Sequence, residues 1–210
     1  YMCFGKVPKK EIVKAFDVSL ILYAEHSFNV STFTARTITS SLSDIHGAIT
    51  GAIASLKGSL HGGANEEVMH MLKKIKKPEN AKKWILDALE NKKLVMGFGH
   101  RVYRKGDSRV PTMKKYYYKV AELLKEKKLP KISQIIEDVM IEKKNIHPNV
   151  DFPTGPTYHM MGFDTDFFTP IFVMSRITGW SAHIMEQHAA NKLIRPLSKY
   201  SGEKHRKVML

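Results

Sequence analysis

The sequence predicts an all-α fold. Apolar residues recur at steps of three and four along most of the 210-residue chain, which is the spacing of one helix face. Strand signals are thin, because the apolar run from Leu94 to Met96 is too short to build a sheet. Hydrophobic residues make up 43% of the chain, enough to bury a core. These observations favour a folded protein of packed helices.

Two helical segments are expected in the first quarter of the chain. The apolar segment from Ile12 to Tyr23 is typical of a core helix. A longer stripe predicts a single helix face made of Ile38, Leu42, Ile45, Ile49, Ile53 and Leu56. The small residues inside this stripe would let another helix pack very close; they are Gly47, Ala48, Gly51 and Ala52.

Further apolar stripes predict the remaining helices. The first has Ala64, Val68, Met71, Leu72 and Ile75 and ends at Lys76, Lys77 and Pro78. Three more contain Ala81, Trp84, Ile85, Ala88 and Leu89; Val120, Leu123 and Leu124; and Ile132, Ile135, Ile136, Val139 and Met140. A long buried helix is expected from about Thr165, with Phe168, Ile171, Phe172, Ser175 and Ile184 inside it and Gly179 as a candidate irregularity.

Charge and cysteine content narrow the function classes. The net charge is +14, from 34 Lys and Arg against 20 Asp and Glu, and favours anionic partners. An equally good interpretation is that the lysines keep the helices soluble. The single Cys3 excludes an internal disulfide framework and suits a reducing compartment such as the cytoplasm or, in a eukaryote, the mitochondrial matrix. No apolar run approaches the roughly 20 residues of a membrane span.

Four polar segments are expected to be loops: residues 58–63, 97–111, 145–156 and 194–202. In the first, SLHGGANEE places His61 in a glycine turn that leads into a helix. The free N–H groups and positive dipole of a helix start attract anions and disfavour a charged imidazolium. A neutral His61 could therefore donate a hydrogen bond to a developing enolate oxygen. The alternative is a polar histidine near a helix cap.

The stretch GFGHRVYRKGDSR again places a histidine next to glycines: His100 follows two glycines and precedes a run of basic residues. Gly97 and Gly99 would let the backbone approach a ligand closely. Arg104, Lys105 and Arg109 could grip carboxylates or phosphates. The alternative is an exposed basic loop. The glycine spacing does not match a dinucleotide-binding fingerprint.

Three more segments carry candidate groups. IHPNVDFPTG holds Asp151 between apolar neighbours in a proline-stiffened loop, where a raised pKa would suit a general base; the alternative is a helix cap. AEHSFNVSTFTAR adds His26 and Asn29 before a helix start, and LIRPLSKY adds Arg195. Taken alone, His26, Asn29 and Arg195 are better explained as a core-edge histidine, a helix cap and a surface arginine.

Other site classes find no support. His183 and His188 are five residues apart and do not share a helix face as the histidines of a zinc-binding H-E-x-x-H motif would, and we predict no metal site. The sequence has no G-x-S-x-G nucleophile motif. Basic residues are spread over many segments, and no nucleic-acid-binding signature is present.

Taken in order, these segments resemble the citrate synthase family. The matching words are HSFN, SLHGGANE, GFGHRVYRKGDSR, PNVDFPTG, RITGWSAH and IRPLSKY, from about Tyr23 to Gly202. TFTAR, LHGGANE and FFTPIFVMSRITGW look most like the bacterial and archaeal branch, which includes 2-methylcitrate synthases. Six motifs in this order overturn the individual alternatives. Two loop positions differ from the usual pattern, Ser59 and Ser108.

The resemblance implies a chemistry for these residues. Oxaloacetate would bind through His26, Asn29, His100, Arg109 and Arg195. Asp151 would take a proton from the methyl group of acetyl-CoA, and His61 would stabilise the enol. The enol would attack oxaloacetate with His100 as donor or acid, and hydrolysis would release citrate and CoA. Coenzyme A would lie along Gly97, Phe98, Gly99 and Arg104, with no metal or other cofactor.

The resemblance also implies a domain division. Residues 62–157 would form a small mobile domain that closes over the site, and residues 1–61 and 158–210 would belong to a large domain. The family has a further N-terminal segment and forms homodimers, so this chain is expected to correspond to the later part of such a protein. We expect no nucleic-acid or membrane partner. The open alternatives are propionyl-CoA as the substrate, a non-catalytic helical module that binds polyanions, and a fragment that binds ligands without turnover.

Overall fold

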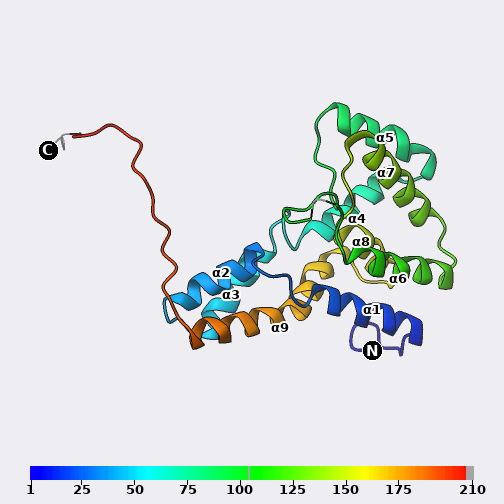
Figure 1. Cartoon of the computed structure of the whole chain (residues 1–210). Helices are drawn as coiled ribbons and strands as arrows, with labels where there is room; N and C mark the ends of the chain where they lie inside the picture. Colours follow the sequence, from blue (N-terminus) through cyan, green and yellow to red (C-terminus); the bar gives the residue numbers. More distant parts are fainter. Residues whose placement is uncertain (104, 207–210) are drawn as a thin grey trace.

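The computed structural model describes residues 1–103 and 105–206, and it is helical as the sequence predicts (Figure 1). The elements are α1 (Lys10–Tyr23), α2 (Val30–Ser40), α3 (Ile45–Leu56), α4 (Ala64–Ile75), α5 (Pro78–Glu90), α6 (Val110–Leu123), α7 (Lys128–Lys144), α8 (Asp151–Met160), the 3-10 turn η1 (Thr165–Phe167) and α9 (Phe168–Ala189). An isolated antiparallel bridge joins Phe98 to Pro148.

The helices pack in two groups that meet near the loops. In one group α2 and α3 form a hairpin against the long α9. In the other, α5 packs on α7, and α8 packs on both α4 and α6. Helix α1 contacts both α6 and α9, and α4 also touches α9. After α9 the chain continues as an extended segment that leads away from the helices (Figure 1). The domain boundaries at residues 61/62 and 157/158 stay a prediction.

The apolar stripes of α4, α5 and α7 supply much of the core, as predicted, whereas four residues of the other stripes are exposed: Leu42, Ile45, Ile53 and Leu124. Every stripe residue of α4 is buried: Ala64, Val68, Met71, Leu72 and Ile75. The first helix covers the expected segment and buries Ala15, Val18 and Tyr23. None of the helices in the described part of the chain is long and apolar enough to cross a membrane.

One predicted helix face is in fact two helices. The stripe from Ile38 to Leu56 is interrupted after Ser40, where Leu42 adopts a left-handed φ of 66°. Asp44 begins α3, because its side chain accepts a hydrogen bond from the Gly47 N–H at 2.8 Å. The apolar period continues across the turn, but it does not mark one buried face, because Leu42, Ile45 and Ile53 are exposed. The expected close packing is present, since a side chain on Gly51 would overlap Ile38 of α2.

A second difference concerns Asp151, which lies in the first turn of α8 rather than in a loop. Pro153 is tolerated there because N–H groups in the first turn have no intrahelical acceptor. Pro156 lies inside the helix. Thr154 and Thr157 donate their hydroxyls to the carbonyls of Val150 and Pro153, both at 2.6 Å. Each buried hydroxyl is thus satisfied by a carbonyl one turn earlier in the chain.

Gly179 does not interrupt α9, which is continuous to Ala189. Its N–H donates to the carbonyl of Ala24 at 3.2 Å. A side chain at this position would overlap that carbonyl oxygen. The glycine is therefore explained by the close approach of the chain between α1 and α2 to the surface of α9.

Candidate active site

A cavity of about 1050 Å³ lies where the loops of the two helix groups meet. Its walls come from the α1–α2 segment, the turn before α4, residues 94–103 and the start of α8. Nine of the predicted site residues line it: His26, Asn29, His61, Gly97, Phe98, Gly99, His100, Arg109 and Asp151. The tertiary structure thus brings together residues that are up to 125 positions apart in sequence (151 − 26).

One predicted residue, Arg195, is not among those that line this cavity, and another lies outside the described residues. Arg195 lies in the extended segment after α9, and its guanidinium contacts only the neighbouring carbonyl of Pro196, at 3.4 Å, within the described residues. Arg104 lies outside the described residues. The roles of both arginines stay predictions.

His61 is held in one tautomer by the start of α2. The backbone N–H of Ser31 donates to His61 Nε2 at 3.3 Å, and the Ser31 hydroxyl lies 2.8 Å from the same nitrogen. Because a backbone N–H can only donate, Nε2 is the acceptor and the ring proton sits on Nδ1. Burial, with the nearby Arg176, lowers the pKa of His61 to about 4. The imidazole is neutral at pH 7, as expected, and its Nδ1–H is available to a ligand.

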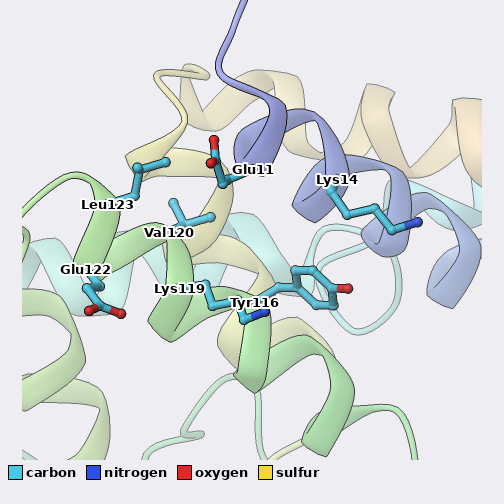
Figure 2. Close-up of a pocket in the computed structure, with 7 residues that line it drawn as sticks. All are labelled: Glu11, Lys14, Tyr116, Lys119, Val120, Glu122 and Leu123. Atoms are coloured by element: carbon cyan, nitrogen blue, oxygen red, sulfur yellow. The ribbon is translucent and has the colours of Figure 1, made fainter.

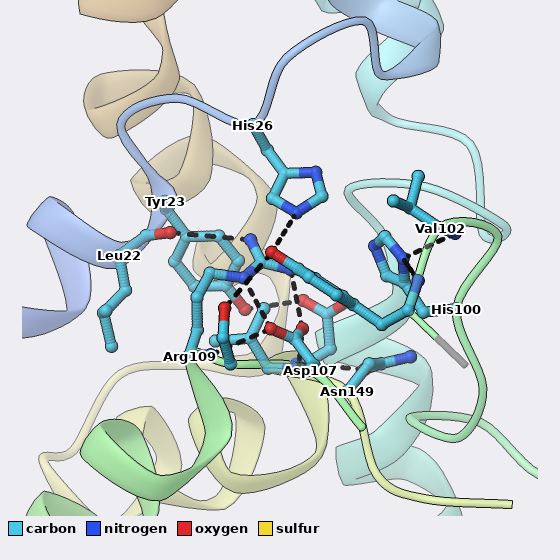
Figure 3. A network of polar contacts seen from close by, with 12 residues as sticks. Leu22, Tyr23, His26, His100, Val102, Asp107, Arg109 and Asn149 are labelled. Carbon is cyan, nitrogen blue, oxygen red and sulfur yellow. Dashed lines mark hydrogen bonds and ion pairs between the residues drawn. The ribbon is translucent and has the colours of Figure 1, made fainter. Parts of the chain in front are cut away.

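His100 is held in the opposite tautomer. The backbone N–H groups of Val102 and Tyr103 both donate to Nδ1, at 3.0 and 3.2 Å, so Nε2 carries the proton (Figure 3). His26 lies beside it, with ring centroids 5.0 Å apart. Its Nε2 is 3.2 Å from the Tyr103 hydroxyl. Burial and Arg109 lower the pKa of His26 to about 4, and burial lowers that of His100 as well. Both rings are therefore neutral polar groups on the cavity wall.

Arg109 is aimed by a buried carboxylate, Asp107 (Figure 3). The guanidinium donates to both Asp107 oxygens, with contacts of 3.0 Å from Nε and 2.8 Å from an Nη. The Asp107 side chain has no exposed surface and also accepts the Val150 backbone N–H at 3.0 Å. Burial opposes its ionisation, but the bonds from Arg109 and the backbone lower the pKa of Asp107. This ion pair therefore joins the cation of the cavity to the start of α8.

Asp151 has the properties expected of a general base. Burial raises its pKa to about 6, against the opposing effects of a hydrogen bond from Tyr23 and the charge of Arg109. The Tyr23 hydroxyl donates to Asp151 Oδ1 at 2.5 Å. A carboxylate with this pKa is ionised at pH 7 yet is more basic than an ordinary aspartate. The geometry therefore fits removal of a weakly acidic proton.

The glycines of residues 97–99 serve the fold as well as the cavity. Gly97 has φ 82°, and a side chain there would lie 2.7 Å from Val68 and 2.9 Å from Phe152. Asn149 holds the same stretch, since its N–H donates to the Gly97 carbonyl at 2.9 Å and its amide to the Gly99 carbonyl at 3.0 Å. The close backbone approach at Gly97 is thus to the protein's own α4 and α8.

Arg176 is the main residue that sequence reasoning missed. It lines the cavity from α9, is 1% exposed, and donates through Nε to the Tyr23 carbonyl at 2.6 Å. Its Nη1 is buried and has no hydrogen-bond partner within residues 1–103 and 105–206. Burial and the charge of Arg109 lower its pKa to about 10, so it stays a cation at neutral pH. The available signal was an arginine inside the apolar stretch IFVMSRITGW, where an unpaired charge is costly.

A smaller hollow of about 460 Å³ lies between α1 and α6 and contains none of these residues (Figure 2). Two acidic and two basic side chains line it with Tyr116 and two apolar residues: Glu11, Glu122, Lys14, Lys119, Val120 and Leu123. The described residues contain no group of three or more His, Cys, Asp or Glu side chains placed to hold a metal ion.

Three neutral histidines, a basic carboxylate and two arginines thus line one cavity of a helical fold, a set of groups suited to binding a small anion and moving a proton. The family model described as citrate synthase, C-terminal domain, matches residues 1–197. The chain therefore belongs to the citrate synthase family, as its motifs indicate.

Named relatives and solved structures agree with this membership. A 2-methylcitrate synthase of Mycobacterium tuberculosis is 58% identical over 206 residues, which cover 98% of this chain and 52% of the relative. A citrate synthase of Mycolicibacterium smegmatis is 56% identical over 99% of this chain and 56% of its own length. The chain thus spans about half the length of these relatives.

The fold is similar to that of solved citrate synthases. The Thermoplasma acidophilum enzyme, in a ternary complex with carboxymethyl coenzyme A and oxaloacetate, superposes with a TM-score of 0.88 at 39% identity. The match covers 98% of this chain and 56% of that one.

Proposed function

We propose that this chain carries the site at which an acyl-CoA condenses with oxaloacetate. The observation that supports this most is the joint placement of three groups on one cavity: a base, Asp151, and two neutral histidine donors, His61 and His100, in opposite tautomers. Two arginines, Arg109 and Arg176, supply the positive charge for a dianionic substrate.

Oxaloacetate binding is assigned to the cationic side of the cavity. The Arg109 Nη1, which Asp107 does not engage, and the Nη1 of Arg176, which has no hydrogen-bond partner among the described residues, would donate to its carboxylates. His100 would donate from Nε2 to the keto oxygen. His26 and Asn29 would complete the pocket, with Asn29 fixed as the cap of α2 by accepting the Thr32 N–H at 3.1 Å.

The chemical step is assigned to Asp151 and His61 acting together. The α-protons of a thioester are weakly acidic, so a base alone is inadequate. Asp151 would remove the proton while the Nδ1–H of His61 donates to the thioester oxygen, where negative charge develops. The enol carbon would then attack the keto carbon of oxaloacetate, and His100 would stabilise or protonate the new alkoxide. Water would cleave the thioester of the adduct and release the free acid and CoA. The reaction needs no metal or prosthetic group.

Propionyl-CoA is our first choice of acyl donor, with 2-methylcitrate as the product, and acetyl-CoA is the second. The support is that the relatives with 58% and 55% identity are named 2-methylcitrate synthases, alongside a citrate synthase at 56%. The acyl groups differ by one methylene, which is worth only about 1–3 kcal/mol of discrimination. This choice revises the sequence-based preference for acetyl-CoA.

We further propose a homodimer in which Arg195 serves a partner's site. Exposed apolar side chains lie on the helices that flank α9 and on α9 itself: Val30, Phe33, Ile45, Ile53, Met174, Ile177 and Met185. The extended segment after α9 leads away from the helices (Figure 1), and Arg195, which belongs to it, does not line the cavity of its own chain. Mixing Asp151→Asn and Arg195→Ala chains tests this, because exchange of subunits would restore one intact site per dimer. No recovery of activity would show that Arg195 does not act in the partner.

The function is tested by CoA thiol release with oxaloacetate and either propionyl-CoA or acetyl-CoA. Release that requires oxaloacetate supports the condensing reaction, and the ratio of kcat/KM values identifies the acyl donor. The Asp151→Asn variant is the matched control for non-enzymatic hydrolysis. Absence of oxaloacetate-dependent release from a folded protein would contradict the proposal. A location in the cytoplasm stays a prediction.

A further inference from the structure

The segment between α1 and α2 must be held by its surroundings. It carries His26 and Asn29 but has no regular structure of its own. Within it Ser27 adopts a left-handed φ of 49°. This conformation is costly for a residue with a side chain and persists where neighbouring groups enforce it. The position of His26 therefore depends on contacts made by the adjacent residues.

One face of α9 binds the start of this segment, one residue at a time. Positions 176, 179 and 183 are three and four residues apart and so lie on the same side of the helix. The contacts are Arg176 Nε to the Tyr23 carbonyl at 2.6 Å, the Gly179 N–H to the Ala24 carbonyl at 3.2 Å, and His183 Nε2 to Glu25 Oε1 at 2.9 Å. Consecutive residues thus pair with successive turns of α9, through the Arg, Gly and His of the RITGWSAH motif.

His183 is oriented by Arg36 of α2. The Arg36 Nη1 lies 2.9 Å from His183 Nδ1, and its Nε donates to Gln187 at 3.1 Å. A guanidinium only donates, so Nδ1 accepts and the His183 proton sits on Nε2, facing Glu25. Both side chains are well covered, at 15% exposed for Arg36 and 13% for His183. The Phe28 ring lies over the Arg36 guanidinium with its centroid 5.1 Å away.

Glu25 connects this group to the strained residue. Its Oε1 accepts the hydrogen bond from His183 and also one from the backbone N–H of Ser27. Burial opposes its ionisation, but these two hydrogen bonds lower the pKa of Glu25. The same carboxylate oxygen thus ties the left-handed residue next to His26 to the rigid surface of α9.

We propose that Glu25 and His183, with His183 oriented by Arg36, are positioning residues that hold His26 and Asn29 in the oxaloacetate site. They act through the backbone of Ser27 and not by touching the substrate. This inference rests on the proposed function, since it assigns these residues to the oxaloacetate side of the same cavity.

The test compares four variants of the full chain. Glu25→Ala removes the acceptor, whereas Glu25→Gln keeps an acceptor oxygen and removes only the charge. His183→Phe keeps a flat ring and removes the two ring nitrogens that connect Arg36 to Glu25. Lys114→Ala is the control, because it deletes a partly covered ion pair with Glu137, 2.7 Å long, between α6 and α7 and away from the site. Oxaloacetate binding is measured by calorimetry, kcat and KM by thiol release, and amide hydrogen exchange over residues 26–30 by mass spectrometry.

The expected result separates position from charge and from general stability. Glu25→Ala and His183→Phe should weaken oxaloacetate binding up to about tenfold, the effect of losing one ordinary hydrogen bond. Both should speed exchange at residues 26–30 and raise the KM for oxaloacetate more than they lower kcat. Glu25→Gln should rescue both properties, and Lys114→Ala should change neither.

Two results would overturn the inference, and they can be told apart. Unchanged exchange and binding in Glu25→Ala, with a wild-type protein that binds oxaloacetate, would refute the positioning role while leaving the proposed function intact. Failure of the wild-type protein to bind oxaloacetate would refute the proposed function, and with it the assignment of Glu25 and His183 to that site.

Discussion

Replacing Tyr23 by Phe should shift the pH dependence of catalysis. The Tyr23 hydroxyl donates to Asp151 Oδ1 at 2.5 Å and so stabilises the ionised form of the base. Phenylalanine keeps the ring, which packs on Phe172 with centroids 4.0 Å apart, and removes only the donor. The carboxylate then stays in its buried site with less support for its charge. Its pKa should therefore rise.

The size of the shift follows from the hydrogen bond. A bond to a charged group contributes about 1.5–3 kcal/mol, and one pKa unit corresponds to about 1.4 kcal/mol. The pKa of Asp151 should therefore move from about 6 to about 7–8. Since the base must be ionised, activity should be lost at a correspondingly higher pH as the solution is acidified. Well above pH 8 the variant should recover most of its kcat/KM.

The assay is the profile of kcat/KM for the acyl-CoA between about pH 5 and pH 9, a range that spans both expected pKa values. Tyr158→Phe is the matched control, because its buried hydroxyl lies 2.9 Å from Ser19 and not on Asp151. The control should lose about 1 kcal/mol of stability without moving the acid limb. An acid limb at the same pH in Tyr23→Phe and wild type would refute the argument that Tyr23 sets the basicity of Asp151.

Three further substitutions test the site and its support. Asp151→Asn should abolish turnover and keep oxaloacetate binding. Because folding raises the pKa of Asp151, the native state favours the protonated acid, and this stabilisation is lost as the pH rises through 6. In thermal unfolding the variant should therefore be more stable than wild type by about 2–3 kcal/mol at pH 7, but not at pH 4. Asp107→Asn should lower the free energy of unfolding in urea by about 3–5 kcal/mol, since Arg109 loses its buried carboxylate partner. Because folding lowers the pKa of Asp107, this carboxylate stabilises the wild type at pH values above the ordinary pKa of an aspartate, and the difference should shrink as the pH falls. Gly179→Ala should destabilise by about 1–3 kcal/mol and raise the KM for oxaloacetate, because the new methyl group overlaps the Ala24 carbonyl; an unchanged KM would show that the α9 contact does not position the segment.

Most of the secondary structure follows from local pattern. The stripe from Ala64 to Ile75 and the glycine turn with His61 are local features, and both lie where the sequence predicts them. The break between α2 and α3 was not predicted, because an apolar period alone does not reveal that Leu42 turns the chain back on itself. The local signal was Asp44, whose capping bond begins the second helix.

By itself the sequence determined the helical class, the family resemblance and the chemical type of the site, because periodicity and residue identity are properties of the chain. Only the tertiary structure decided which nitrogen of His61 and of His100 carries the proton, since the donors that choose it come from backbone N–H groups placed by folding. It also decided that Arg176 and Tyr23 belong to the site. Both residues lie in apolar helix patterns that read as core, and burial next to Asp151 turns their polar ends into functional groups.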